Sequence, residues 1–223
     1  MAESLLMASM AVGGGFAKKV VAMTSSHFAS SERQYRFPLG YGGQRTPTAQ
    51  WTVTGSGAAL VTTEPGPIAI ESATIGTVRD LGITDANNMG AAMAPAAYQS
   101  LSAFFRETNT RPQDYDRIFT GDLGELGHSI VLDFFARDGI DLSANYQDCG
   151  MLLYDNSQDV HAGASGCGCS AAVLCGRLLP DLAAGKLKKV LFCGTGAMMS
   201  PTSANQGESI PGICHLVCLE GGL

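Results

Sequence analysis

The sequence lacks the features that mark several classes of protein. Its 223 residues contain 14 Lys and Arg against 20 Asp and Glu, giving a formal net charge of −6 with no basic patch. This balance argues against a nucleic-acid partner. No apolar run approaches the ~20 residues that span a bilayer, and the start of the chain lacks the basic segment of a signal peptide. We therefore expect neither a transmembrane segment nor a signal peptide.

Patterns that bind metals are also scarce. The chain has four histidines and seven cysteines, and no two cysteines stand in C-x₂-C spacing. A zinc site needs such paired spacings, so we predict no metal site and no cofactor. An odd number of cysteines argues against a disulfide framework and for buried thiols in a reducing compartment. Five lie in apolar or glycine-rich surroundings: Cys167, Cys169, Cys175, Cys193 and Cys218.

Glycine is abundant, with 28 residues, many of them in clusters where a tight turn or a close approach to a ligand needs a missing side chain. Strand and helix patterns alternate between these clusters, which predicts a layered α/β fold. In such folds, ligands bind beyond the carboxyl ends of the strands. We predict helices at residues 3–10, 96–106 (with Pro95 at the start), 127–138 and 167–184, and strands at 19–23, 51–63, 68–78, 114–120, 189–193 and 212–220.

Three short segments, in the right order, resemble motifs of the thiolase family. They are DANNMGAAMAPAA at residues 85–97, HAGASG at 161–166 and CGTG at 193–196. The resemblance implies a thiolase-like α/β/α fold, with residues 1–63 as the remainder of the N-terminal half and 64–223 as the C-terminal half. The nucleophilic cysteine of that family lies just upstream of the helix that here begins at Met1. The resemblance therefore also implies that the first strands of the N-terminal half are missing.

Condensing enzymes need a thiolate at a helix N-terminus, a base and an oxyanion hole. His161 stands one residue closer to the following glycines than the thiolase histidine does, which would turn its imidazole away from an acyl carbonyl unless the backbone bulges. Asp122 follows the strand end where ketosynthases carry His or Asn, and a carboxylate there would oppose an oxyanion. Cys193 fits either the second thiolase cysteine or a buried thiol. We predict no catalytic residue.

Further segments resemble one branch, the stage V sporulation AD proteins of endospore formers. They include TSSHF at 24–28, TAQWT at 48–52 and SGCGCS at 165–170. The resemblance implies non-catalytic binding of dipicolinic acid, or its calcium chelate, for uptake into the developing spore. It also implies other proteins of a spore membrane channel complex as partners, and a place at the periphery of the spore inner membrane or in the cytoplasm.

Candidate ligand-binding residues gather at predicted strand ends and in the matched segments. Arg45 is the best cation for a carboxylate, although a structural salt bridge explains it as well. Asp122 and Glu125 suit calcium if the ligand arrives as a chelate, with a helix N-cap as the alternative for Asp122. Trp51 either stacks on the ligand ring or belongs to the core. The full set is Ser25, Ser26, His27, Arg45, Gln50, Asp122, Glu125, His161 and Thr195.

Two other functions stay open on the sequence. The first is a thiolase- or ketoacyl-synthase-type acyltransferase, which predicts an acyl adduct on a cysteine. The second is a homodimerisation scaffold, with the long loop at residues 30–48 as a contact.

Overall fold

The computed structural model describes residues 1–36 and 45–222, and its central element is a five-stranded sheet. The strand order is β4-β9-β8-β5-β6. β5 runs parallel to β8 and β6, whereas β9 runs antiparallel to β8 and β4. The strands are β4 (Ile68–Thr74), β5 (Arg117–Thr120), β6 (Tyr146–Asp148), β8 (Lys189–Ala197) and β9 (Gly212–Gly221).

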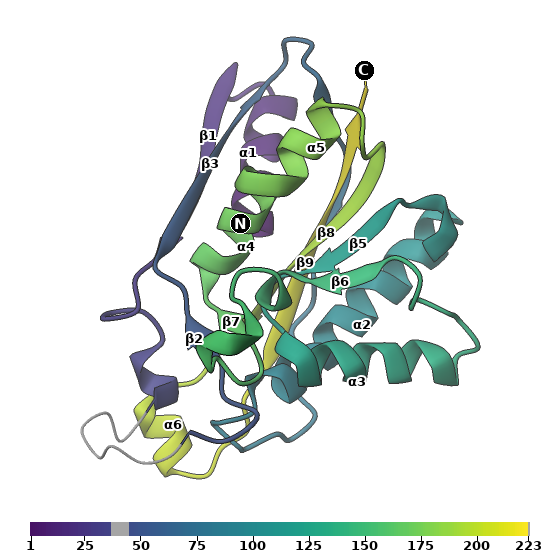
Figure 1. Ribbon diagram of the computed structural model, residues 1–223. Coiled ribbons are helices and arrows are strands. Elements are labelled where there is room, and N and C mark those ends of the chain that lie inside the picture. Colours follow the sequence, from purple (N-terminus) through teal and green to yellow (C-terminus); the bar gives the residue numbers. More distant parts are fainter. Residues whose placement is uncertain (37–44, 223) are drawn as a thin grey trace.

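Helices cover both faces of this sheet, and a second sheet lies beyond one helix layer (Figure 1). On one face lie α2 (Met89–Thr108) and α3 (Gly124–Arg137). On the other lie α1 (Ala2–Gly13) and one continuous helix made of α4 (Cys167–Val173), a π-helical turn (Leu174–Leu178) and α5 (Leu179–Ala183). The second sheet pairs β1 (Lys19–Ser26) with β3 (Gly55–Thr62) in antiparallel register.

Strand β8 shows why the sheet is buried on both faces. Val190 and Phe192 belong to the core cluster under α1 and α4, while Leu191 and Cys193 belong to the cluster under α2. Successive side chains of a strand point to opposite faces, so an unbroken apolar run fills two cores. All four side chains are fully buried.

Several elements differ from those expected from the sequence. The predicted strand at 51–63 splits into β2 (Trp51–Thr52) and β3, because β2 pairs in parallel with β7 (Ala164–Ser165). Helix α2 begins seven residues before the predicted start, since the Asn88 side chain accepts a hydrogen bond from the Ala91 N–H at 3.1 Å and caps the helix there. Pro95 therefore lies inside the helix. Strand β8 continues to Ala197, through the glycines expected to end it.

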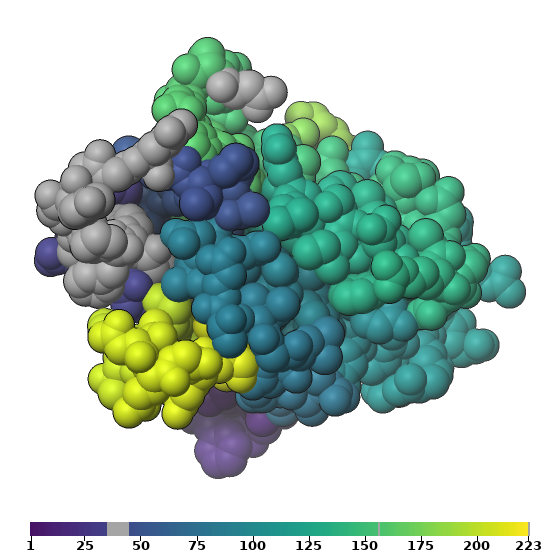
Figure 2. All heavy atoms as spheres, turned by 90° about the horizontal axis from the view of Figure 1, so that it is seen from below, coloured from purple at the N-terminus to yellow at the C-terminus, as the bar shows by residue number. Residues whose placement is uncertain are grey.

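A loop layer closes the lower end of the molecule. In Figure 2, the yellow segment around α6 (Pro201–Asn205) lies beside the blue-teal segment that precedes α2. The Ile210 N–H donates to the Ile83 carbonyl at 2.8 Å, and Met199 and Ile210 are buried there. The remaining short turns are η1 (Arg33–Arg36), η2 (Pro112–Asp114), η3 (Cys149–Met151) and η4 (Asn156–Gln158). Within residues 1–36 and 45–222, no helix is long and apolar enough to cross a membrane.

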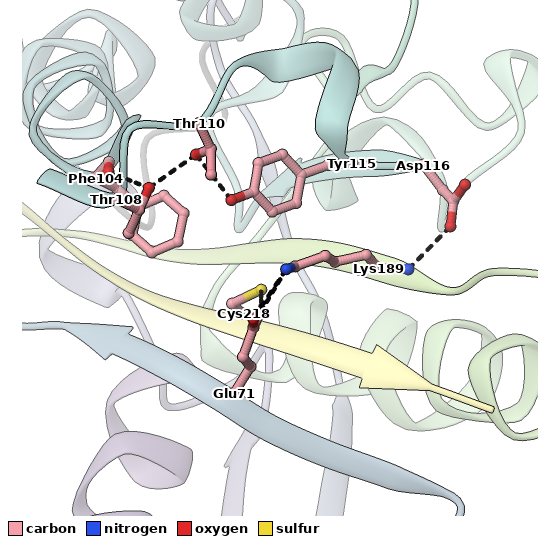
Figure 3. A network of polar contacts seen from close by, with 8 residues as sticks. All are labelled: Glu71, Phe104, Thr108, Thr110, Tyr115, Asp116, Lys189 and Cys218. Carbon is pink, nitrogen blue, oxygen red and sulfur yellow. Dashed lines mark hydrogen bonds and ion pairs between the residues drawn. The ribbon is translucent and has the colours of Figure 1, made fainter. Parts of the chain in front are cut away.

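An ion pair joins β4 to β8 across the intervening strand β9 (Figure 3). The pairing register of β4 shifts between Ile70 and Ser72, which leaves Glu71 at a bulge. Its carboxylate meets the Lys189 ammonium at 2.7 Å and accepts a contact from the Cys218 thiol at 3.1 Å. The same ammonium lies 5.7 Å from the centroid of the Tyr115 ring.

Candidate functional site

A cavity of about 750 Å³ opens where β5 and β8 end. Asp122 follows β5 by two residues, and Thr195 belongs to the last part of β8. The wall is mixed, with Phe28, Trp51, Met89, Met93 and Ile213 among its apolar residues. The lining residues that can ionise or bond through their side chains include Glu3, Glu32, Arg45, Gln50, Asp122, Ser165, Cys167, Thr195 and His215.

Asp122 is the most enclosed charged group of the cavity, with 8% of its surface exposed. Thr195 Oγ1 donates to Oδ1 of Asp122 at 2.8 Å, and the Gly166 N–H donates to Oδ2 at 2.8 Å. The Asp122 N–H in turn donates to Thr195 Oγ1 at 3.1 Å, which fixes the threonine hydroxyl as a donor to the carboxyl group. Gln50 Nε2 donates to the Asp122 carbonyl at 2.8 Å. Three segments therefore hold this residue in place, through Thr195, Gly166 and Gln50.

A second carboxylate, Glu32, faces the same cavity. Thr52 and Ser165 both donate their hydroxyls to its Oε2, at 2.6 and 2.7 Å. Gly166 lies between the two acids, because its N–H bonds Asp122 and a Cβ on it would stand 3.5 Å from Glu32 Oε2. The Gly166 backbone has φ +94, a conformation that L side chains rarely adopt, so only glycine fits this position without strain.

Burial and the neighbouring Glu32 carboxylate raise the pKa of Asp122 from 3.8 to about 7. The hydrogen bonds from Thr195 and Gly166 oppose this rise without cancelling it, because desolvation of the charged form is the larger effect. Burial also raises the pKa of Asp148, at the end of β6. Near pH 7 the cavity therefore holds a carboxyl group, that of Asp122, which is protonated in a substantial fraction of the molecules.

Arg45 forms the cationic part of the wall. Its guanidinium lies 4.9 Å from the centroid of the Trp51 ring, which itself stacks on Phe28 at 4.6 Å. One terminal nitrogen, Nη2, pairs with Asp159 Oδ2 at 3.2 Å and also donates to the Asp159 carbonyl. The other, Nη1, is buried and has no hydrogen-bond partner among residues 1–36 and 45–222. The salt bridge that was the alternative role for Arg45 is therefore present, and it leaves Nη1 without an acceptor in the described part of the chain.

Four of the nine predicted ligand-binding residues line the cavity: Arg45, Gln50, Asp122 and Thr195. The other five do not, namely Ser25, Ser26, His27, Glu125 and His161. Glu125 is exposed on α3, so the structure does not bring it together with Asp122 as the calcium hypothesis required. No group of three His, Cys, Asp or Glu suited to a metal ion occurs in the described part of the chain.

The residues outside the cavity have structural contacts. Ser26 Oγ donates to the Val53 carbonyl at 2.7 Å and accepts the Gly168 N–H at 2.9 Å, which ties β1 to the start of α4. His27 is exposed, and its Nδ1 accepts the Ala29 N–H. His161 contacts the Thr46 carbonyl through Nδ1 and Asp159 through Nε2, so both ring nitrogens are engaged in the loop.

The alternative N-cap role of Asp122 is filled by another residue. The carboxylate of Asp148 accepts the N–H groups of Leu123 and Gly124, each at 3.0 Å, at the start of α3. Asp122 is thereby left to face the cavity. Thr120 adds a hydroxyl hydrogen bond to Asp148 at 2.6 Å.

The sequence did not reveal Glu32, Ser165 or Cys167 as cavity residues. Cys167 was expected to be buried, and this was wrong, because it is exposed at the first residue of α4 and its thiol contacts the Ser25 carbonyl at 3.1 Å. The glycines around Cys167 were the signal in the sequence that could have revealed these cavity residues, because glycines leave this end of the cavity unfilled by side chains. Part of the expected contact loop at 30–48 lies outside the described residues.

Comparison with known proteins places these features in a family. Residues 1–220 match the sequence profile described as Stage V sporulation protein AD. A curated relative, stage V sporulation protein AD of Bacillus subtilis (strain 168), is 49% identical over 218 residues, which cover 98% of this chain. The chain spans 64% of that relative's length.

Solved structures with a similar fold include a condensing enzyme and an acyl-carrier-protein synthase, both at low sequence identity. A tetronic acid condensing enzyme, AbyA1, superposes with a TM-score of 0.61 at 14% identity, over 99% of this chain and 65% of the other. A 3-oxoacyl-[acyl-carrier-protein] synthase III from Aquifex aeolicus gives 0.52 at 12% identity, over 98% and 63%. At these identities the likeness shows the fold alone, and it confirms the expected thiolase-like α/β class.

Proposed function

The chain belongs to the stage V sporulation protein AD family, and from this premise we propose that it serves sporulation by binding dipicolinate in the cavity beside Asp122, without catalysing a reaction. Dipicolinate is a planar pyridine ring with two carboxylates. Small-molecule sites are concave, mostly apolar and of ~300–1,000 Å³, with a few placed polar groups. The cavity of about 750 Å³ falls in that range.

One observation carries the proposal, namely the unused donor of Arg45. A buried guanidinium N–H without a partner is costly, and a ligand carboxylate supplies the acceptor that the described part of the chain does not. The Asp159 pair holds the guanidinium in position against Trp51, so little rotational freedom is lost when a ligand binds. Gln50 and Thr195 belong to the same wall.

Calorimetric titration of the chain with dipicolinate tests the proposal. We expect Arg45→Gln to weaken binding about ten- to a hundred-fold, since a hydrogen bond to a charged group contributes ~1.5–3 kcal/mol. The matched control is Arg106→Gln, because Arg106 is a highly exposed arginine on α2 and does not line the cavity. Absence of binding at millimolar dipicolinate, with or without calcium, would sink the proposal.

The cellular part of the proposal rests on family membership. We propose that the protein works with other components of a spore membrane channel complex, at the periphery of the spore inner membrane or in the cytoplasm. A homodimer belongs to the same proposal, and light scattering distinguishes it directly from a 23.2 kDa monomer.

Acyl transfer is the second candidate, and the Cys167 thiol favours it. This thiol lines the cavity at the first residue of α4, and a cysteine thiol can serve as the nucleophile of acyl transfer. The imidazole of His215 lines the same cavity, although its Nδ1 already accepts the Gly76 N–H at 3.2 Å. Incubation with an acyl-CoA followed by intact mass measurement decides between the candidates: an adduct present in the wild type and absent in Cys167→Ala supports acyl transfer.

A further inference from the structure

The two oxygens of Asp122 are each used once by the protein. Thr195 donates to Oδ1 and Gly166 donates to Oδ2, and no other donor to this carboxyl group is present in the described residues. A carboxyl group has about four lone-pair positions, so each oxygen keeps one free. Because Asp122 lines the cavity, a proton on a free position is available to a molecule bound there.

The charged and titratable groups around Asp122 come from every element packed against it. Glu32 precedes η1, Asp148 ends β6, Cys149 belongs to η3 and Cys169 belongs to α4. Arg45 lines the same cavity and pairs with Asp159 instead. No Lys or Arg forms an ion pair with Asp122 within residues 1–36 and 45–222.

This arrangement decides which form of Asp122 suits an anionic ligand. If Asp122 were ionised, a bound dicarboxylate would add two negative charges to a cavity that already holds Glu32 and Asp122, and whose arginine, Arg45, is already paired with Asp159. Like charges at short distance in a buried site are strongly unfavourable. A neutral acid removes one of these charges and offers an O–H donor instead. Enzymes use protonated carboxyl groups as donors in apolar sites in the same way.

We propose that Asp122 binds the ligand in its acid form and donates its carboxyl proton as a hydrogen bond to a ligand carboxylate, so that one proton is bound with each ligand. This rests on the proposed function and specifies how that site recognises an anion. The proton comes from solvent when Asp122 is ionised in the empty cavity. No covalent bond changes.

The proposal predicts the direction in which the affinity for the ligand changes with pH. The carboxyl groups of an aromatic dicarboxylic acid are ionised above roughly pH 6, so the ligand does not change its charge beyond that point. Only the competent, protonated fraction of Asp122 binds, and the apparent affinity scales with that fraction. The pKa of Asp122, raised to about 7, places the change in the neutral range. The affinity should be constant below this value and fall about tenfold for each pH unit above it.

Calorimetry with dipicolinate from pH 6 to 9, in two buffers with different ionisation enthalpies, measures both the affinity and the number of protons bound. We expect the uptake of close to one proton per ligand at pH 8. Asp122→Asn keeps a neutral donor, so its affinity should not change with pH and should exceed that of the wild type at pH 9. Glu125→Gln is the matched control, since Glu125 is an exposed acid nearby, and this variant should keep the wild-type profile.

The outcomes separate this inference from the proposed function. Failure of the wild type to bind at any pH overturns both. Binding with no proton uptake and no pH dependence overturns the inference that Asp122 binds in its acid form, and leaves the proposed function intact. Binding that needs calcium and strengthens as the pH rises also overturns this inference, because Asp122 would then act as an ionised ligand of the cation. Proton uptake is measured on the wild type, so a variant that fails to fold leaves the test intact.

Discussion

Asp122 is a buried acid whose raised pKa bears on the stability of the fold as well as on the proposed binding. Its pKa is raised to about 7 in the folded chain, against ~3.9 in an unfolded one. A carboxyl group with a raised pKa stabilises the fold fully below the unfolded value, and this stabilisation is lost as the pH rises through the folded value. A difference of about three units corresponds to ~4 kcal/mol as an upper bound.

Urea unfolding between pH 5 and 8 should therefore show that the wild type loses stability as the pH rises. Asp122→Asn should flatten most of this slope, because the amide does not ionise. We attribute the slope that remains to Asp148, because burial also raises the pKa of that residue. An asparagine variant that loses stability as steeply as the wild type would contradict the assignment to Asp122.

At this scale the sequence predicted some of the cavity residues and missed the contacts that place others. Asp122 and Thr195 follow predicted strand ends and do line the cavity, because strand ends in α/β folds meet at one edge. Ser25 and Ser26 follow the same rule and do not line it, although Thr24 of the same strand does. Glu32 reaches the site through Ser165, 133 residues away, and no local pattern announces such a contact.

At the level of secondary structure, the bulge in β4 leads to a prediction about the ion pair between Glu71 and Lys189. Lys189 lowers the pKa of Glu71, and Glu71 raises the pKa of Lys189. Because the pKa of Glu71 is lowered, the stabilisation is present above the unfolded value and is lost as the pH falls through the folded one. Both side chains are partly exposed, at 42% and 29%, so solvent screens the pair.

We expect Glu71→Gln to lower the free energy of unfolding by roughly 0.5–1 kcal/mol at pH 7, and by less at pH 3, as measured in urea. Lys186→Met is the control. It removes a pair with Asp181 whose lysine is 72% exposed, and we expect almost no change. If both variants lose the same free energy of unfolding, the position of the Glu71–Lys189 pair across three strands contributes no extra stability.

The sequence located most helices and strands but not β6, β7 or α6, and the ends of the located elements depended on contacts that it did not reveal. Periodicity found β8 because apolar residues fill both faces, and it stopped at Gly194 because glycine usually weakens a strand. In the structure Gly194 pairs with His215, and a Cβ there would stand 2.8 Å from Ala2 Cβ. The packing of α1 requires that glycine, and the strand continues through it.

Across the whole molecule, the cavity is made by segments that lie far apart in the sequence. Glu32, Arg45 and Gln50 come from residues 1–63, whereas Asp122 and Thr195 come from residues 64–223. The four layers seen in Figure 1 bring these segments to one end of the fold. The proposed ligand site therefore draws on both parts of the chain, and we expect neither part alone to bind dipicolinate.

Because Cys167 is exposed and lines this cavity, it reports on occupancy of the site. Cys175 is partly exposed and lies outside the cavity, and the other five cysteines are buried. Alkylation needs access to the thiol, so iodoacetamide should modify Cys167 first, Cys175 more slowly and the rest only after unfolding. Saturating dipicolinate should slow the modification of Cys167 at least several-fold and leave Cys175 unchanged, as peptide mass spectrometry can follow. Equal rates at Cys167 with and without bound dipicolinate would place the ligand elsewhere on the molecule.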